Sequence, residues 1–125
     1  MQMPWDLKSD RPIYIQLIEH IELMIFSGVY PLGSKLPSVR DMAQAAAVNP
    51  NTMQKALVKL EDDGLIITHR TSGRSITEDA RMVERAKAKL AQAQISEFLD
   101  KMKLIGFEQT EILTILDTMV KELKK

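Results

Sequence analysis

Residues 38–63 read SVRDMAQAAAVNPNTMQKALVKLEDD, a stretch that decides the fold because it holds two short helices and a break between them. Ser38 can cap the first helix, since a serine hydroxyl accepts a hydrogen bond from a backbone N–H of the first turn. Asp41 follows three residues later, in the position from which a carboxylate reaches back in a capping box. We predict that this helix covers Val39 to Ala46.

The second helix of this stretch begins after the break at residues 47–49. Asn49 can cap it, and Pro50 suits its first position because the N–H that proline lacks would have no partner there. Apolar residues then recur at helical spacing and predict a buried face made of Met53, Ala56, Leu57 and Leu60. Gly64 is typical of a helix end, so we expect the helix to finish near Asp63.

A longer amphipathic helix precedes this pair. Apolar side chains recur at helical spacing between Pro12 and Ser27, which predicts a helix over that range. Gly28 suits its end because glycine adopts a positive φ without penalty. The connection over residues 31–37 contains two prolines and a glycine and cannot be regular helix, although Lys35 and Leu36 could form a short strand.

A β-hairpin should follow the second short helix. Residues 65–68 are rich in β-branched side chains, residues 71–73 suit a turn, and residues 76–77 would form the return strand. The only charged side chains in this hairpin are Arg70 and Arg74. We therefore expect a small wing that is locally basic, with no acid to cancel its charge.

The chain after residue 77 is rich in alanine, leucine and charged residues, which favours helix. Gly106 interrupts the apolar stripe, so we predict two helices joined by a short turn, the second starting near Glu108. So small an arm can bury its apolar faces best against a second copy of the chain, which predicts a homodimer. The residues expected in that contact are Val83, Leu90, Phe98, Met102, Ile112, Leu116, Met119 and Leu123.

These elements predict a fold that is mainly α with a small β wing: a winged helix-turn-helix over residues 1–77 and a two-helix dimerisation arm over 78–125. Such a motif places its second helix in the DNA major groove, where each base pair displays a distinct set of donors and acceptors. Short polar and long forked side chains near the start of that helix would read base edges, while the first helix and the wing would hold phosphates. The candidate DNA-binding residues are Ser38, Arg40, Asn51, Thr52, Gln54, Lys55, Arg70, Gly73 and Arg74.

Several motifs resemble the GntR family of bacterial regulators. They are Pro12-Ile13-Tyr14-x-Gln16, Gly33-x-x-Leu36-Pro37-Ser38-x-Arg40, Val48-Asn49-Pro50-Asn51-Thr52, Gly64-Leu65-Ile66 and Arg70-Thr71-Ser72-Gly73-Arg74. The short two-helix tail resembles the YtrA-type subgroup. The resemblance implies a winged-helix homodimer that is usually a repressor and could control a transporter operon. It also implies that the tail over 78–125 mainly serves dimerisation and sometimes senses a small-molecule effector.

The resemblance also implies DNA contacts at Arg40, Asn51, Thr52 and Gly73. Pro50 and Gln54 depart from the arginines that other GntR branches often place there, so their operator code does not transfer, and glutamine indicates an adenine contact instead. Ser75 replaces a bulkier residue that is common after the wing turn, which predicts looser packing of the wing.

Composition excludes several other classes of protein. The chain has no cysteine, which removes disulfides and thiolate zinc sites. Neither His20 nor His69 has a second ligand at metal spacing, so we expect no metal and no cofactor; His69 could instead approach a phosphate. We interpret residues 61–63 as a solvated acidic helix end and not as a catalytic pair, so we expect no enzyme.

The absence of a long apolar run and of a signal-peptide pattern predicts a cytoplasmic protein with no membrane contact. The 17 basic and 17 acidic side chains give a net charge of zero, so only local charge can favour DNA. This balance leaves an alternative open, in which the winged-helix shape serves as a protein-protein interaction module. Polar residues in the reading turn favour DNA, because a protein interface would more often carry apolar anchors there.

Overall fold

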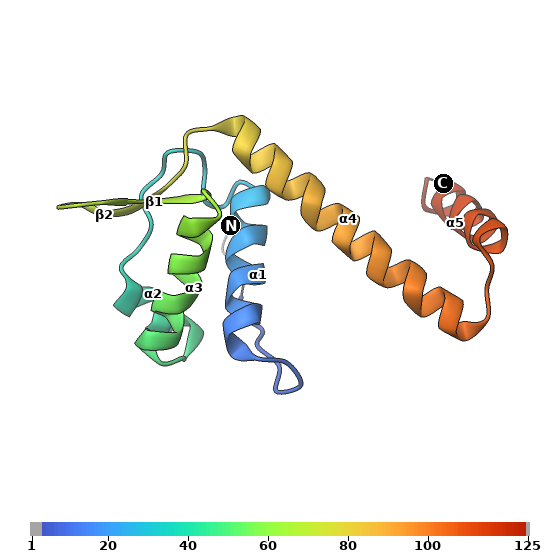
Figure 1. The fold of residues 1–125 in the computed structure, drawn as a ribbon, viewed down its shortest axis with the longest axis horizontal. Coiled ribbons are helices and arrows are strands. Elements are labelled where there is room, and N and C mark those ends of the chain that lie inside the picture. The colour runs from blue at the N-terminus through green and yellow to red at the C-terminus, as the bar shows by residue number, and fades with distance from the viewer. Residues whose placement is uncertain (1–3, 125) are drawn as a thin grey trace. The chain divides into compact units, whose positions relative to one another are not determined.

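The computed structural model describes residues 4–124 and contains two compact units, one ending at Lys87 and one starting at Ala88. The element order is α1, α2, α3, β1, β2, α4 and α5 (Figure 1). This is the mainly helical fold with a two-stranded wing that the sequence predicts. The DNA-binding candidates all lie in the first unit.

Three helices build the first unit: α1 over Ile13–Phe26, α2 over Val39–Ala46 and α3 over Pro50–Asp62. Helix α2 has the predicted bounds, and the other two differ from prediction by about one residue at their ends. Pro12 lies just before α1 and not inside it. The apolar periodicity is therefore sufficient to locate all three helices.

Local side-chain caps fix the starts of α2 and α3. The Ser38 hydroxyl accepts a hydrogen bond from Asp41 N at 3.0 Å, and the Asn49 side chain accepts one from Asn51 N at 2.8 Å. Ser38 and Asp41 do not complete the predicted capping box, since no bond from the Ser38 N–H to the Asp41 carboxylate is formed within residues 4–124. Ala47 ends α2 with a φ of 58°, a left-handed conformation that permits the tight turn of the motif.

The wing consists of β1, Ile66–His69, paired antiparallel with β2, Gly73–Ile76. The predicted hairpin is confirmed, but β2 begins at Gly73, which the sequence placed in the turn. Lys35 forms an isolated bridge with Ser75, and the Leu36 N–H donates to the Arg74 carbonyl at 2.9 Å. The connection after α1 therefore runs beside β2, on the side away from β1.

The core of this unit lies where α1, α2, α3 and the wing meet. The fully covered side chains include Leu17, Ile21, Met53, Leu57, Leu60, Leu65, Ile66 and Ile76. Burial of each such leucine or isoleucine contributes about 1.5–3 kcal/mol. Three of the methionines, Met24, Met42 and Met53, belong to this cluster, where their unbranched side chains fill irregular gaps.

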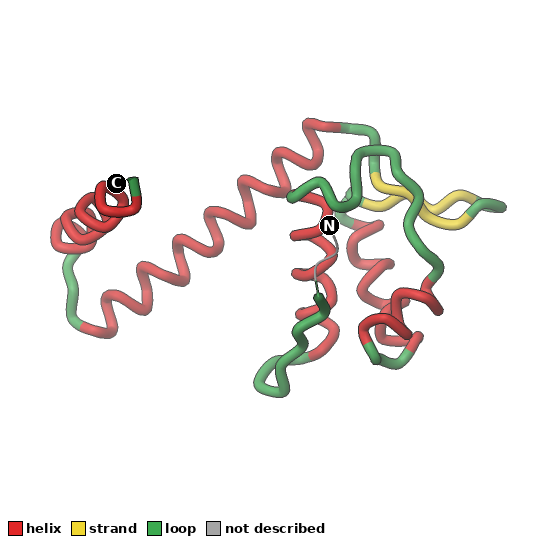
Figure 2. Tube along the Cα trace, turned by 180° about the vertical axis from the view of Figure 1, so that it is seen from behind, coloured by secondary structure: helices red, strands yellow, loops and turns green. Residues whose placement is uncertain are grey.

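Gln16 fastens the segment that precedes α1. This segment runs back alongside the helix (Figure 2), and the buried Gln16 side chain reaches it with three hydrogen bonds. Its oxygen accepts from Lys8 N at 2.6 Å, and its amide donates to the carbonyls of Lys8 at 2.7 Å and Arg11 at 2.8 Å. Trp5, farther along the same segment, stacks on His20 of α1 with ring centroids 4.1 Å apart.

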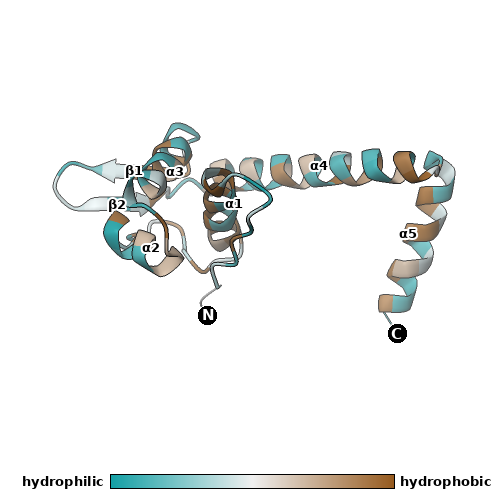
Figure 3. Ribbon diagram, turned by 90° about the horizontal axis from the view of Figure 1, so that it is seen from below, coloured by the Kyte–Doolittle hydropathy of each residue, from teal (hydrophilic) through white to brown (hydrophobic). Residues whose placement is uncertain are grey.

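The arm consists of α4, Ala80–Ile105, and α5, Gln109–Leu123. Gly106 separates them with a φ of 113°, and Glu108 and Glu111 form a capping box at the start of α5. Apolar segments recur along both helices (Figure 3). The predicted helix, break and helix are therefore confirmed.

Val83 was predicted to lie in the dimer contact, and for this residue the prediction is wrong. Its side chain is only 8% exposed and belongs to the core cluster of the first unit. The start of α4 therefore packs on its own winged-helix unit, and Val83 is not free to meet a second copy. The apolar stripe alone could not distinguish these two uses of a buried position.

Candidate nucleic-acid interface

The first turns of α3 present the predicted reading face. Asn51, Gln54 and Lys55 are exposed and Thr52 is half-buried, while Met53, Ala56 and Leu57 face the core. Within residues 4–124 the four polar side chains make no hydrogen bond or ion pair of their own. They are therefore free to exchange water for base edges or phosphates, as a major-groove helix requires.

The start of α2 adds a second set of polar groups. Arg40 is exposed, and its guanidinium has no acidic partner in the described part of the chain. The Ser38 hydroxyl already accepts the cap bond from Asp41 N, which leaves its own O–H to donate. A guanidinium and a hydroxyl at a helix start are groups that contact phosphate oxygens.

The wing holds two arginines in different environments. Arg70 follows β1 at the exposed tip, beside Gly73, which has a φ of 87°. Arg74 lies within β2, opposite Thr68 of β1. Its side chain is only 16% exposed, and its Nε lies 3.9 Å from Glu61 Oε2. The Nε atom is buried without a hydrogen-bond partner in the described chain. Only Arg70 has the accessibility of a free phosphate ligand.

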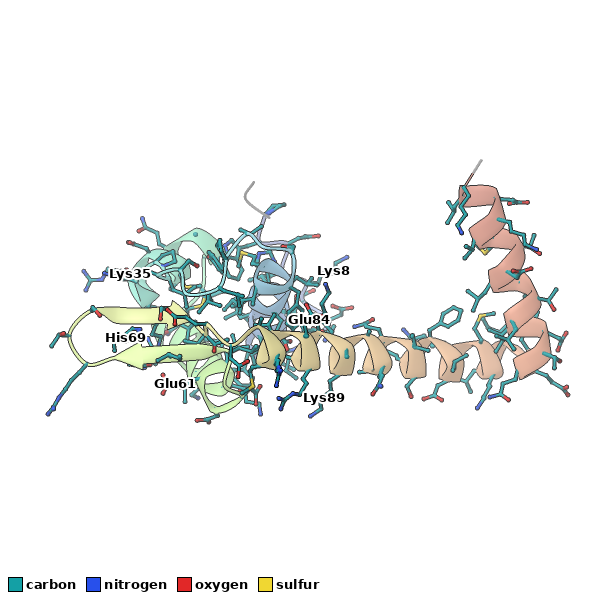
Figure 4. The ribbon with its side chains drawn as sticks, turned by 90° about the horizontal axis from the view of Figure 1, so that it is seen from above. Lys8, Lys35, Glu61, His69, Glu84 and Lys89 are labelled. Atoms are coloured by element: carbon teal, nitrogen blue, oxygen red, sulfur yellow. The ribbon has the colours of Figure 1, made fainter. Side chains whose placement is uncertain are left out.

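Glu61 corrects the expectation of an uncompensated basic wing. Its carboxylate faces Arg74 and also accepts a hydrogen bond from the Thr68 hydroxyl of β1, and Figure 4 shows Glu61 close to the wing. The hairpin contains no acid in its own sequence, but α3 supplies one across space. The acidic end of α3 is therefore not simply solvated, because Glu61 connects that helix to the wing.

The remaining acids at the end of α3 affect its neighbour α1. Asp63 forms an ion pair with Lys59 at 3.1 Å, and this hydrogen bond raises the pKa of the lysine. Partial burial raises the pKa of Glu22 on α1, and the charges of Asp63 and Glu19 raise it further. Acidic side chains of α1 and of the end of α3 are thus close enough to affect one another.

His69 and Ser75 form a polar contact across the wing. His69 Nε2 lies 2.7 Å from Ser75 Oγ. The small serine, which was expected to loosen the wing, therefore connects the two strands by a hydrogen bond. The approach of His69 to a phosphate stays a prediction, since this ring nitrogen already has a partner.

Lys35 is a candidate that the sequence analysis missed as a DNA ligand. Its side chain is exposed, and its Cε lies 3.9 Å from the point where a Cβ on Gly73 would stand. The bridge between Lys35 and Ser75 carries this ammonium group to the wing. The predicted short strand at Lys35 was the available signal, but the pairing partner of that strand was not evident.

The arm presents apolar surface along most of its length. Exposure is 39% for Phe98 and Leu116, 55% for Met119 and 82% for Leu123, whereas Leu90 and Met102 are half-buried. Ile112 is only 1% exposed and therefore supports α5 within the chain. Large exposed side chains that add to this surface are Ile95, Leu104, Ile105, Leu113 and Val120.

Histidine and acidic side chains within residues 4–124 form no group of three that could hold a metal ion. Across the same residues, no helix combines the length and apolar character needed to span a bilayer.

Comparison with known proteins gives consistent matches. A family model described as "Bacterial regulatory proteins, gntR family" matches residues 13–76. The HTH-type transcriptional repressor YtrA of Bacillus subtilis is 36% identical over 105 residues, or 82% of this chain and 80% of that protein. A GntR family transcriptional regulator from Listeria monocytogenes has a TM-score of 0.83 at 33% identity and covers 90% of this chain and 98% of its own.

Several of the similar structures are complexes with operator DNA. The DNA-binding domain of AraR, solved in complex with operator ORX1, is 27% identical to this chain with a TM-score of 0.52. The match covers 62% of this chain and 92% of that domain.

Proposed function

The chain belongs to the GntR family of bacterial regulatory proteins, and from this premise we propose that it acts as a homodimeric repressor on an inverted-repeat operator. Membership makes it a DNA-binding transcriptional regulator with a winged helix-turn-helix, and not an enzyme. The repressor role follows the similarity to YtrA. A cytoplasmic location, a transporter operon as target and control by a small-molecule effector are parts of the same proposal.

The exposed first turns of α3 are the observation that carries the DNA-reading part of this proposal. Asn51, Thr52, Gln54 and Lys55 have free side chains on a helix whose opposite face is core. We assign base readout chiefly to Asn51, Thr52 and Gln54. Contacts to phosphate and the minor groove are assigned to Ser38, Arg40, Lys55, Arg70, Gly73 and Arg74, with Lys35 added, and Arg74 acts there mainly by holding the wing in place.

The arm supports the homodimer part of the proposal. We assign residues 1–77 to DNA binding and 78–125 to dimerisation, with the start of α4 fixed to the first unit through Val83. Exposed apolar side chains on α4 and α5 are costly in water at about 25 cal/mol per Å², and a second copy would cover them. Two copies related by a two-fold axis would place their α3 helices on two symmetric half-sites.

The test is fluorescence anisotropy of labelled DNA from upstream of the protein's own gene, with a scrambled duplex as competitor, over a salt series. We expect binding that resists the competitor. The logarithm of the binding constant should fall linearly with the logarithm of the salt concentration, because cationic side chains displace counterions from phosphates. Equal binding to both duplexes, or none at low salt, would contradict the proposal and favour the protein-protein interaction module.

Two variants separate readout from phosphate contact. Gln54→Ala should relax base preference at one operator position by about 1–3 kcal/mol, whereas Arg40→Ala should weaken binding to all sequences and lower the salt slope by about one. The same competition assay measures both effects. Equal losses on every sequence from both variants would overturn the assignment of Gln54 to readout.

A further inference from the structure

A cavity lies between the segment before α1, the end of α1 and the start of α2, and its described lining includes none of the candidate DNA-binding residues. Its volume is about 580 Å³, within the range of about 300–1,000 Å³ that small-molecule sites occupy. Its walls are largely apolar and aromatic: Trp5 comes from the N-terminal segment, Met24 and Tyr30 from α1 and the turn after it, and Met42 and Ala45 from α2. Asp41, from the first turn of α2, adds a carboxylate to these walls.

Asp41 supplies a negative charge that this cavity does not compensate. Its backbone N–H donates to the Ser38 cap, but its carboxylate has no hydrogen bond or ion pair with any residue in the described range 4–124. Among the described residues 4–124, those that line the cavity include no lysine, arginine or histidine.

The aromatic walls favour a cationic ligand, as the Asp41 carboxylate does. Indole and phenol rings attract cations through their π faces, with tryptophan the strongest of the side chains. Burial raises the pKa of Tyr30 above its ordinary 10.0, so its phenol is neutral at pH 7. The methionines add adaptable apolar contact, which suits the body of an organic molecule.

We propose that this cavity binds an organic cation with a bulky apolar body, such as a hydrophobic ammonium or phosphonium ion. The apolar body would lie against Met24, Met42 and Ala45, and the charge between Asp41 and the rings of Trp5 and Tyr30. This site is independent of the proposed operator binding, because its ligand is recognised by a cavity in one chain without DNA or a second copy.

Trp5 in the cavity wall is the single tryptophan of the chain, so its intrinsic fluorescence can report binding in the cavity. The full-length protein is titrated with tetraphenylphosphonium and, separately, with tetraphenylborate, which has nearly the same size and shape and the opposite charge. Tryptophan fluorescence and equilibrium dialysis follow binding. We expect saturable binding of one phosphonium per chain and at least about tenfold weaker binding of the borate, a difference of about 1.4 kcal/mol.

Matched variants locate the site. Asp41→Asn should reduce phosphonium affinity about tenfold or more, and Ala45→Leu should reduce it by filling the cavity. Asp100→Asn, an exposed aspartate on α4, should bind as the wild type does. Circular dichroism melting identifies any variant that fails to fold. If either Asp41→Asn or Ala45→Leu does not fold, the other variant tests the location of the site.

Three outcomes would overturn the proposal. They are no saturable phosphonium binding, equal affinity for the two ions, and unchanged phosphonium affinity in folded Asp41→Asn. Because no DNA is present in this experiment, its failure would leave the operator proposal untouched.

Discussion

Gln16 shows how one side chain can fix a segment that has no regular structure. Its amide group satisfies one N–H and two carbonyls of the segment before α1. Buried backbone groups that lose such partners cost about 1–3 kcal/mol each. The glutamine of the Pro12-Ile13-Tyr14-x-Gln16 motif is therefore explained by its ability to donate and accept at once.

Gln16→Glu should lower the free energy of unfolding by about 1–3 kcal/mol, since a carboxylate accepts from Lys8 N but cannot donate to the two carbonyls. Urea denaturation at neutral pH measures this change. Gln94→Glu on the exposed surface of α4 is the control, with an expected change below about 0.5 kcal/mol. Equal changes in the two variants would show that the three bonds add no stability.

Replacement of Glu22 by a neutral residue should stabilise the protein in a pH-dependent way. Because burial and neighbouring acids raise the pKa of Glu22 above the ordinary 4.5, its ionised form is less favourable in the folded protein than in the unfolded chain. Glu22→Gln should therefore stabilise the protein at pH 7, and the advantage should fade as pH drops through the raised pKa and below 4.5. Thermal melting of both proteins across this range measures the difference.

Glu84→Gln on exposed α4 is the matched control for Glu22 and should change the free energy of unfolding by less than about 0.5 kcal/mol at either pH. A Glu22→Gln variant that is less stable than the wild type at pH 7 would show that the acid has a favourable partner in the folded protein.

Residues whose partners lie close in the sequence were predictable, and those with distant partners were not. The Ser38 and Asn49 caps bond within three positions and could be read from the sequence. Arg74 depends on Glu61, thirteen positions earlier and on another element, so its partial burial could not be foreseen from the hairpin alone.

At the scale of elements, the two arginines of the wing should respond differently to truncation. Arg70→Ala should leave the free energy of unfolding within about 0.5 kcal/mol of wild type and lower the salt slope of DNA binding by about one. Arg74→Ala should destabilise the protein, because it leaves the Glu61 carboxylate beside the wing without its cation. Thermal melting and salt-dependent anisotropy distinguish the two. A pure DNA-binding defect in Arg74→Ala would contradict its structural role.

The helices were easier to predict than the strands. The bounds of α2 were predicted fully because a cap residue marks its start and a turn its end. The sequence placed the start of β2 too late, since Gly73 suits both a turn and a strand start, and the choice depends on its pairing with His69. Pairing is a long-range property that a short hairpin sequence specifies weakly.

At the scale of the whole molecule, the apolar arm predicts that a charge on α5 disrupts assembly. Leu116→Asp should shift sedimentation from dimer to monomer and weaken operator binding, because each half-site would then bind alone. The thermal melting of the winged-helix unit should be unchanged. Thr114→Asp, on the opposite face of α5, is the control and should remain dimeric. A dimeric Leu116→Asp that still binds DNA tightly would exclude α5 from the interface.

Val83 illustrates why the sequence could predict an apolar arm but not the extent of its surface. A stripe of apolar residues shows which side of a helix is covered, and not by what. Val83 is covered by its own unit, and Ile112 is covered within the chain. Two of the eight residues predicted for the dimer contact are therefore not accessible to a second copy. The remaining six stay predictions for the dimer.

The hydrogen bonds of Gln16 also govern how much of the protein is competent to bind at any moment. The segment that they hold carries Trp5, one wall of the cavity beside Asp41, so the cavity exists only while that segment is docked. An apparent dissociation constant equals the intrinsic one divided by the docked fraction. If Gln16→Glu reduced that fraction to about a tenth, phosphonium affinity would fall about tenfold although no lining residue had changed, and faster hydrogen exchange at the Lys8 amide would report the same opening.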